Sequence, residues 1–132
     1  MIEKRIFLVF ETLVESIADI ETTADPDAWI PENPLWGHCA VVSLIAQDVF
    51  GGELLRVSLE GIPEFAHMRS HYWNRFPDGL EHDFTRKQFL GKQIDFPTPE
   101  IRTREYLLSN FNTAKRYSLL QTRFLLRTNK SA

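Results

Sequence analysis

The chain has a single cysteine, Cys39, among its 132 residues. One thiol cannot form an internal disulfide, so oxidation does not hold this fold together and we expect the thiol to be reduced. The sequence also lacks a glycine-rich phosphate loop, a dinucleotide-binding fingerprint and a cysteine-rich metal motif. We therefore expect no cofactor, and Cys39 is available for packing or for chemistry.

The start of the chain lacks a long apolar run. Its first apolar segment, residues 6–10, ends at Glu11 and is too short for a signal peptide or a membrane-spanning helix. We therefore expect a soluble, cytoplasmic protein without a membrane partner.

Positive charge is not in excess either. The net charge of -3 argues against general nucleic-acid binding. Residues 1–85 hold 15 acids and 5 bases, whereas residues 86–132 hold 3 acids and 10 bases. The simplest interpretation is that basic C-terminal helices lie against the acidic N-terminal part. The alternative is that one basic helical face meets an anionic partner. That face consists of Arg116, Arg123, Arg127 and Lys130.

Apolar and aromatic side chains are sufficient for one core, at 43% hydrophobic residues with ten Phe, three Tyr and three Trp. We expect a single domain over residues 1–132. Apolar residues at three- and four-residue steps predict an amphipathic helix over residues 3–22. Its apolar face would hold Ile6, Val9, Phe10, Leu13, Ile17 and Ile20. A proline-containing loop follows at 23–36, and residues 38–50, apolar nearly all round and followed by Gly51, predict a buried helix.

Partial alternation of apolar and polar residues predicts strands over residues 53–60 and 66–76. The turn signal Pro-Asp-Gly at residues 77–79 predicts an antiparallel return over residues 80–85. A three-strand meander is therefore expected after the buried helix.

A second proline-containing loop around residues 97–99 precedes two predicted C-terminal helices, which break near residues 110–112. The predicted fold class is α+β. A buried helix that carries Cys39 would pack on a small antiparallel sheet of three or four strands, with N- and C-terminal helices as cover.

The position of Cys39 near a helix start favours its thiolate, because unpaired backbone N–H groups and the helix dipole stabilise negative charge there. If the cap lies near Gly37, Cys39 is in the first turn. If Asn33 caps the helix, Cys39 is a turn deeper and the effect is weaker. The sequence leaves both alternatives open.

The predicted hairpin carries two further candidate groups. With a three-residue loop, Phe76 pairs with Leu80. His71 and Asp83 then become diagonal neighbours on one sheet face, with Cβ atoms roughly 5 to 8 Å apart. A two-residue loop would place them on opposite faces. In the first case His71 accepts the proton of Cys39 and Asp83 fixes the imidazole ring.

This triad predicts acyl transfer: hydrolysis of an amide, isopeptide or thioester, deamidation, or transfer to an amine. The substrate would be a peptide, a protein or a small acyl compound, and the oxyanion hole would use the Cys39 backbone amide with one more donor. Because a free cysteine often only fills core space, the alternative is a catalytically inactive binding protein on the same fold. It would use the basic helical face or an aromatic groove.

Four other residues are candidates for contacting a substrate or an oxyanion: Asn33, Trp36, His38 and Trp73. Trp36 and Trp73 would wall a groove beside the thiol, although tryptophan more often belongs to the core. His38 is most simply a residue that joins the loop to the helix.

A zinc site is the remaining alternative, suggested by His67, His71, His82, Cys39 and Asp83, of which His67 and His71 are four residues apart. Their surroundings predict a strand, in which four residues span about 13 Å, so one metal ion cannot join them. His82 would lie on the sheet face opposite Asp83, packed or solvated. We therefore predict no metal site.

Three motifs resemble the papain-like and transglutaminase-like cysteine superfamily. Gly-His-Cys-Ala at residues 37–40 looks like its Gly-x-Cys helix start. His-Tyr-Trp-Asn at residues 71–74 looks like the strand that carries its histidine, and Asp-Phe-Thr at residues 83–85 looks like the transglutaminase-like ending in Asp-x-Thr. The resemblance covers residues 37–86.

That resemblance implies a cysteine-proteinase-like core with Cys39 as nucleophile, His71 as base and Asp83 as orienting acid. It also puts Asn33 where papain-like enzymes have an oxyanion glutamine. Over more of its length the chain looks like small uncharacterised bacterial proteins of the YunG-like type, which implies a shared fold and supplies no activity.

Overall fold

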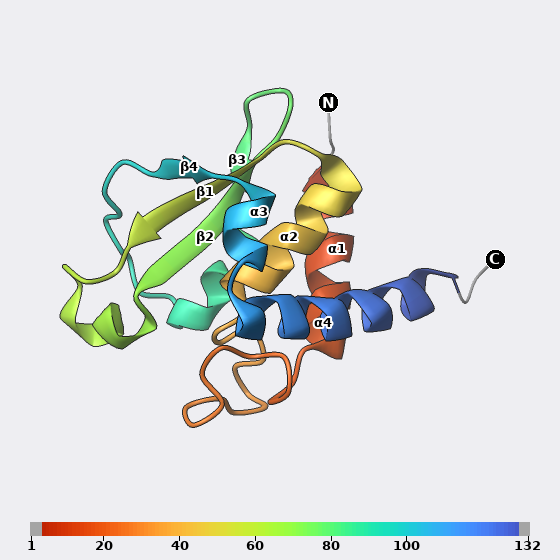
Figure 1. The fold of residues 1–132 in the computed structure, drawn as a ribbon, viewed down its shortest axis with the longest axis horizontal. Helices are drawn as coiled ribbons and strands as arrows, with labels where there is room; N and C mark the ends of the chain where they lie inside the picture. Colours follow the sequence, from red (N-terminus) through yellow and green to blue (C-terminus); the bar gives the residue numbers. More distant parts are fainter. Residues whose placement is uncertain (1–3, 130–132) are drawn as a thin grey trace.

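The computed structural model describes residues 4–129, which form helices and one antiparallel sheet in an α+β arrangement (Figure 1). In chain order the elements are α1 Lys4–Ile17, α2 Cys39–Phe50, β1 Glu53–Ser58, the 3-10 helix η1 Pro63–Met68, β2 Ser70–Arg75, β3 Glu81–His82, the 3-10 helix η2 Arg86–Phe89, β4 Glu100–Arg102, α3 Arg104–Leu108 and α4 Phe111–Asn129. The strand order is β3-β2-β1-β4. The predicted fold class is confirmed.

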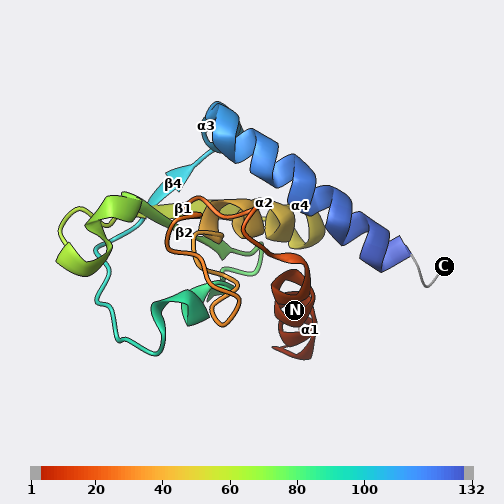
Figure 2. The ribbon, with the colours of Figure 1, turned by 90° about the horizontal axis from the view of Figure 1, so that it is seen from below.

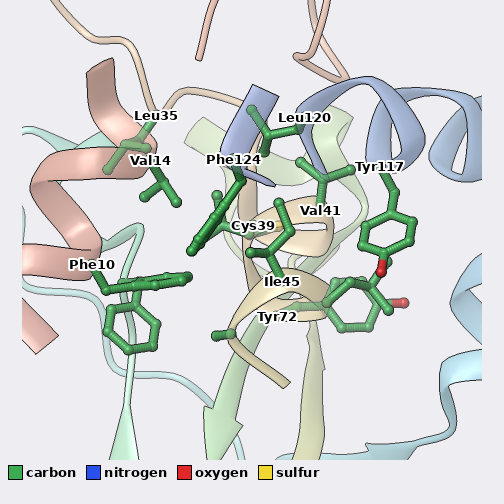
Figure 3. Packing of buried hydrophobic residues seen from close by; sticks show 14 of the residues in the cluster. Phe10, Val14, Leu35, Cys39, Val41, Ile45, Tyr72, Tyr117, Leu120 and Phe124 are labelled. Atoms are coloured by element: carbon green, nitrogen blue, oxygen red, sulfur yellow. The ribbon is translucent and has the colours of Figure 1, made fainter. Parts of the chain in front are cut away.

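Helix α2 is the centre of the fold, with the sheet on one side and α4 on the other (Figures 1 and 2). Its apolar side chains meet those of α1 and α4 in the main core. Figure 3 shows Val41 and Ile45 of α2 among Phe10 of α1 and Leu120 and Phe124 of α4. Each such side chain, once fully buried, contributes roughly 1.5 to 3 kcal/mol, so this cluster fixes α2 in place.

Helix α1 is shorter than predicted and turns a different face inward. Its buried residues are Phe7, Phe10, Val14 and Ile17. The predicted face was wrong in part, because Ile6, Val9 and Ile20 are 48%, 63% and 52% exposed. Apolar residues occupy two adjacent stripes of this segment, and the stripe that carries two phenylalanines packs on the rings of Phe50 and Phe84.

The hairpin has the three-residue loop. The Phe76 N–H donates to the Leu80 carbonyl over 2.8 Å, and Asn74 pairs with His82. This register places residues 71 and 83 on the same face of the sheet, as the three-residue alternative predicts.

The sheet differs from the prediction in three places. The segment 63–68 is the 3-10 helix η1, and Arg69, at φ 67, separates it from β2. The returning strand β3 pairs only over Glu81–His82, since the next residues turn into η2. A fourth strand, β4, pairs with β1 where the sequence predicted only a loop and a helix.

The basic C-terminal helix lies against the acidic N-terminal part, the simpler of the two interpretations. Arg123 forms ion pairs with Asp19 at 3.0 Å and Glu21 at 3.2 Å. Arg116 of that basic face is buried and does not belong to an exposed surface. Lys130 lies outside the described residues. Within residues 4–129, no helix is both long and apolar enough to span a membrane.

Candidate active site

Cys39 is the first residue of α2, so it lies in the first turn of the helix. His38 occupies the cap position, and its side chain makes no capping hydrogen bond. The first helical N–H groups have no intrahelical acceptor by geometry, and they leave the positive end of the helix dipole at Cys39. The other alternative, a cap at Asn33, is wrong.

Gly37 is the reason that the chain can enter α2 at this point. It has φ +72, and a Cβ there would come within 2.2 Å of the Thr23 Oγ1 atom. The Gly37 carbonyl accepts a hydrogen bond from the Ala24 N–H over 2.9 Å. Close contact with the preceding loop therefore requires glycine and sets the position of the thiol.

The thiol of Cys39 belongs both to the core and to a cleft. Its residue is 7% exposed and packs with the main apolar cluster, where Figure 3 shows it near the helix α2 backbone. Its Sγ atom lies 3.9 Å from the Ser70 carbonyl oxygen at the start of β2. Cys39 also lines a cleft of about 780 Å³.

His71 and Asp83 form the hydrogen bond that the hairpin register predicts. The Nε2 atom of His71 lies 2.6 Å from Oδ2 of Asp83, and the side chains are 1% and 13% exposed. Since Asp83 occupies Nε2, the ring nitrogen left for Cys39 is Nδ1. Burial alone would lower the pKa of His71, but the hydrogen bond and charge of Asp83, followed by those of Cys39, raise it to about 10.

The imidazole of His71 lies on the sheet face that points away from the cleft. Its ring stacks on Phe96 at 5.2 Å between centroids and meets the edge of Phe89 at 4.9 Å. Among the described residues that line the cleft, its strand neighbours Ser70 and Tyr72 are present and His71 is not. His71 therefore does not line the cleft itself, whereas Cys39 does.

A chain of buried hydrogen bonds holds Asp83 and ties its turn to α2. The Oδ1 atom of Asp83 accepts from the Thr85 N–H at 3.1 Å and from its hydroxyl at 3.3 Å. Gln88 donates from Nε2 to Thr85 Oγ1 at 2.9 Å, and its Oε1 accepts from the Gly37 N–H at 3.1 Å. Sequence reasoning missed Gln88, a fully buried residue on η2 whose neighbours give no signal of its role.

The cleft has two walls. One is the sheet, with Arg56 and Tyr72, and the other is the region where α3 passes into α4, with Tyr106, Asn112 and Arg116. Cys39 and its neighbours at the start of α2 lie between them. The second wall comes from the C-terminal helices, which the sequence predicted only as cover.

The four weaker candidate residues do not come together at this cleft. Asn33 donates from Nδ2 to the Gln88 carbonyl at 2.9 Å, so its amide is used inside the fold and not as an oxyanion donor. Trp36 donates from Nε1 to Asp25. Trp73 donates to Glu81 and stacks on Phe96, on the far face of the sheet. The predicted tryptophan-walled groove is therefore wrong in the described structure.

His38 is a buried structural histidine. Its Nδ1 lies 2.9 Å from the Trp36 carbonyl oxygen and its Nε2 lies 2.7 Å from the Thr22 hydroxyl. Burial, followed by the charge of Arg116, lowers its pKa to about 4, although the hydrogen bond to the Trp36 carbonyl and the charge of Asp19 act to raise it. The neutral ring donates from Nδ1 and accepts at Nε2, which joins the loop to the helix.

Within residues 4–129, no three His, Cys, Asp or Glu side chains are grouped so that they could hold a metal ion. His67 lies on η1 and not on a strand, so the strand assumption for that residue was wrong. Its Nε2 lies 3.3 Å from Asp25. His82 packs its ring on Phe7 and Phe84, on the sheet face opposite Asp83.

Comparison with known proteins identifies the family. A family model described as "YunG protein" matches residues 8–129. The chain belongs to the YunG family. A curated relative, "Uncharacterized protein YunG" of Bacillus subtilis (strain 168), is 29% identical over 82 residues, which cover 62% of this chain and 64% of the relative's own length. The match thus spans just under two thirds of that relative. No solved structure matches the chain significantly.

Proposed function

We propose that this YunG-family protein is a cysteine-dependent acyl-transfer enzyme, with Cys39 as nucleophile, His71 as general base and Asp83 as the residue that positions His71. The observation that carries the proposal is the buried, hydrogen-bonded pair of His71 and Asp83, whose ring feels the charge of Cys39, a thiol at a helix N-terminus that lines a cleft. A raised histidine pKa beside a cysteine favours an imidazolium–thiolate pair. The papain-like and transglutaminase-like core remains part of this proposal.

In the first half of the reaction, the Sγ thiolate attacks the carbonyl carbon and forms an S–C bond. The carbonyl π electrons move to the oxygen, which becomes an oxyanion. As the tetrahedral intermediate collapses, the C=O bond re-forms, the bond from the carbon to the leaving nitrogen or sulfur breaks, and the leaving amine or thiol takes a proton from the His71 imidazolium. The product is a thioester on Cys39 and a neutral His71.

In the second half, water or an acceptor amine attacks the thioester carbon and loses a proton to His71. The C–S bond breaks, its electron pair returns to sulfur, and the thiolate and imidazolium are restored. Asp83 keeps its charge throughout, because its role is to fix the ring and stabilise the imidazolium.

The oxyanion in this mechanism is stabilised at the start of α2. The backbone N–H of Cys39 is a donor there, and the helix dipole adds to its effect. Because the side chain of Asn33 is bonded to Gln88, we assign no oxyanion role to it.

A binding protein without catalysis is the second candidate, and one observation favours it. Cys39 is 7% exposed and packs in the main core, as a structural cysteine does. In that case the cleft binds a partner and the thiol has no chemical role.

The experiment that separates the two candidates is alkylation of native Cys39 with iodoacetamide as a function of pH, read by intact mass. Because only the thiolate reacts, an active site gives alkylation that persists well below about pH 8 and is slowed by His71→Ala. The matched control is His82→Ala, which removes a histidine on the opposite sheet face that does not line the cleft. Reaction that begins only when the protein unfolds would show that Cys39 is a core residue and that the enzyme proposal is wrong.

A further inference from the structure

Arg116 of α4 is a buried cation beside Cys39. Its residue is 6% exposed and lines the cleft. Its guanidinium donates to three neutral oxygens: Asn112 Oδ1 at 2.7 Å, the Thr22 carbonyl at 3.3 Å and Thr113 Oγ1 at 3.4 Å. Within residues 4–129 it forms no ion pair with a carboxylate. A buried charge without a counter-charge is costly, so it marks a functional position.

Other arginines of the described chain show that carboxylate partners are common here. Arg75, Arg102, Arg104 and Arg123 each form an ion pair with an acid. The three arginines that line the cleft, Arg56, Arg69 and Arg116, form none among residues 4–129. Two acids, Asp25 and Glu60, also line it, and Asp25 is bonded to Trp36 and His67. The cleft therefore has an excess of positive charge.

Arg116 and Cys39 are electrostatically linked. Burial lowers the pKa of Arg116, and the negative charge of Cys39 acts to raise it. When Cys39 is acylated, the thiolate charge disappears and the guanidinium loses that favourable interaction. An anionic group on the substrate would replace that charge in the same cleft.

We propose that the cleft is selective for acyl substrates that carry a carboxylate or another anionic group close to the reacting carbon, and that Arg116 binds that group. This inference rests on the proposed function, because it assumes that Cys39 is the nucleophile. Arg56 and Arg69 also line the cleft and add to its positive field.

The test compares two alkylating reagents of nearly equal size, anionic iodoacetate and neutral iodoacetamide. In both reactions the Sγ thiolate forms an S–C bond and iodide leaves. The measured quantity is the ratio of the iodoacetate rate to the iodoacetamide rate at pH 7 and low salt. The chain unfolded in urea provides the reference ratio for the same thiol without its surroundings, so this comparison requires no variant.

We expect the native ratio to exceed the unfolded ratio by about tenfold or more, since a nearby cation attracts the anionic reagent. Arg116→Gln should abolish most of that excess, and Arg116→Lys, which keeps the charge, should retain it. The matched control is Arg127→Gln on the same helix, which removes one positive charge away from this cleft and should leave the ratio unchanged.

Three results would overturn the inference. If native Cys39 reacts with iodoacetamide but the ratio is no higher than in urea, the substrate is not selected by charge, and the enzyme proposal stands. If the ratio is high and Arg116→Gln leaves it high, another group, such as His71, supplies the attraction. If neither reagent reacts before unfolding, the proposed function fails and the inference fails with it.

Discussion

The Nε2 atom of His71 and the Oδ2 atom of Asp83 lie 2.6 Å apart, with one residue on β2 and the other just after β3. The bond depends on the hairpin register, since a shift by one residue would send the two side chains to opposite faces. It also leaves Nδ1 as the only ring nitrogen that can serve Cys39. The length of the hairpin loop therefore determines whether His71 can form the hydrogen bond with Asp83 that it needs to act as a base for Cys39.

Replacing Asp83 should change the pH profile of Cys39 alkylation. Asp83→Asn removes the charge that helps hold His71 protonated, so the imidazolium–thiolate pair becomes weaker. We expect the alkylation rate at pH 7 to fall by about tenfold or more, which corresponds to about 1.4 kcal/mol. Rates from intact mass across pH 5 to about 9 would check this.

The control for this prediction is Asp78→Asn in the turn of the same hairpin. The exposed Asp78 caps the Leu80 N–H through Oδ1, and an asparagine can keep that bond. Its profile should match that of the wild type. Equal profiles for Asp83→Asn and the wild type would remove Asp83 from the mechanism.

Gln88 should act as a positioning residue for the acid and for the helix start. Gln88→Met has a similar length but leaves the Gly37 N–H without its acceptor and Thr85 Oγ1 without its donor. An unsatisfied buried group costs about 1 to 3 kcal/mol. We expect a corresponding loss of unfolding free energy in urea, together with alkylation that needs higher pH.

The exposed Gln93 provides the control for that variant. Gln93→Met should change neither the stability nor the pH profile. A Gln88→Met protein that loses stability but keeps the wild-type alkylation profile would show that Gln88 supports the fold and does not position the site.

The existence of the hairpin and of the helix that carries Cys39 could be predicted because their determinants are local, whereas the loop length and the helix cap stayed open between two alternatives each. A Pro-Asp-Gly turn sets the loop that brings His71 to Asp83, and an apolar run flanked by glycines marks the helix that begins at Cys39. Each of these signals lies within a few residues of the structure that it specifies.

The cleft could not be predicted, because its walls depend on how distant elements pack. Arg116 falls on a basic helical face in the sequence, and only the packing of α4 on α2 shows that it is buried. Trp73 lies beside His71 in the chain, yet it stacks on Phe96 of a loop whose position no local pattern specifies. Strand β4 has three residues, too few for alternation to be visible.

Gly37 should tolerate no side chain. In Gly37→Ala the new Cβ would have both a positive φ and a contact of 2.2 Å with Thr23 Oγ1. Gly79 also has a positive φ, but a Cβ there would meet nothing within 4 Å. Gly79→Ala therefore measures the backbone strain alone, roughly 1 kcal/mol or more.

The difference between these two alanine variants isolates the clash at the entry to α2. We expect Gly37→Ala to lose clearly more unfolding free energy in urea than Gly79→Ala, and to alkylate Cys39 with an altered rate. Equal losses of unfolding free energy in the two variants would show that the loop before α2 can move away from the new Cβ at little cost. Gly37 would then not fix the position of the thiol.

The stability of the protein should fall on the acid side because of His38. Its pKa in the fold is about 4, against an ordinary 6.5, so the folded state favours the neutral ring. As pH falls from 6.5 to 4, His38 binds a proton in the unfolded chain but not in the folded state. The free energy of unfolding therefore falls by up to about 3 kcal/mol. Asp19 and Arg116 face the ring and keep opposite charges in this range. His38→Gln should flatten this limb of the urea-unfolding profile.

The stability of the protein should also fall on the alkaline side, because of His71. Its pKa in the fold is raised to about 10 from an ordinary 6.5, so its stabilising charge is fully present below pH 6.5 and is lost as pH rises towards 10. The free energy of unfolding should therefore peak near pH 6.5 and decline on both sides. His71→Gln should lower the peak and flatten only the alkaline limb. If the wild-type stability instead stays constant from pH 6.5 to 10, His71 is not held protonated in the fold, and Cys39 loses the imidazolium on which its reactivity depends.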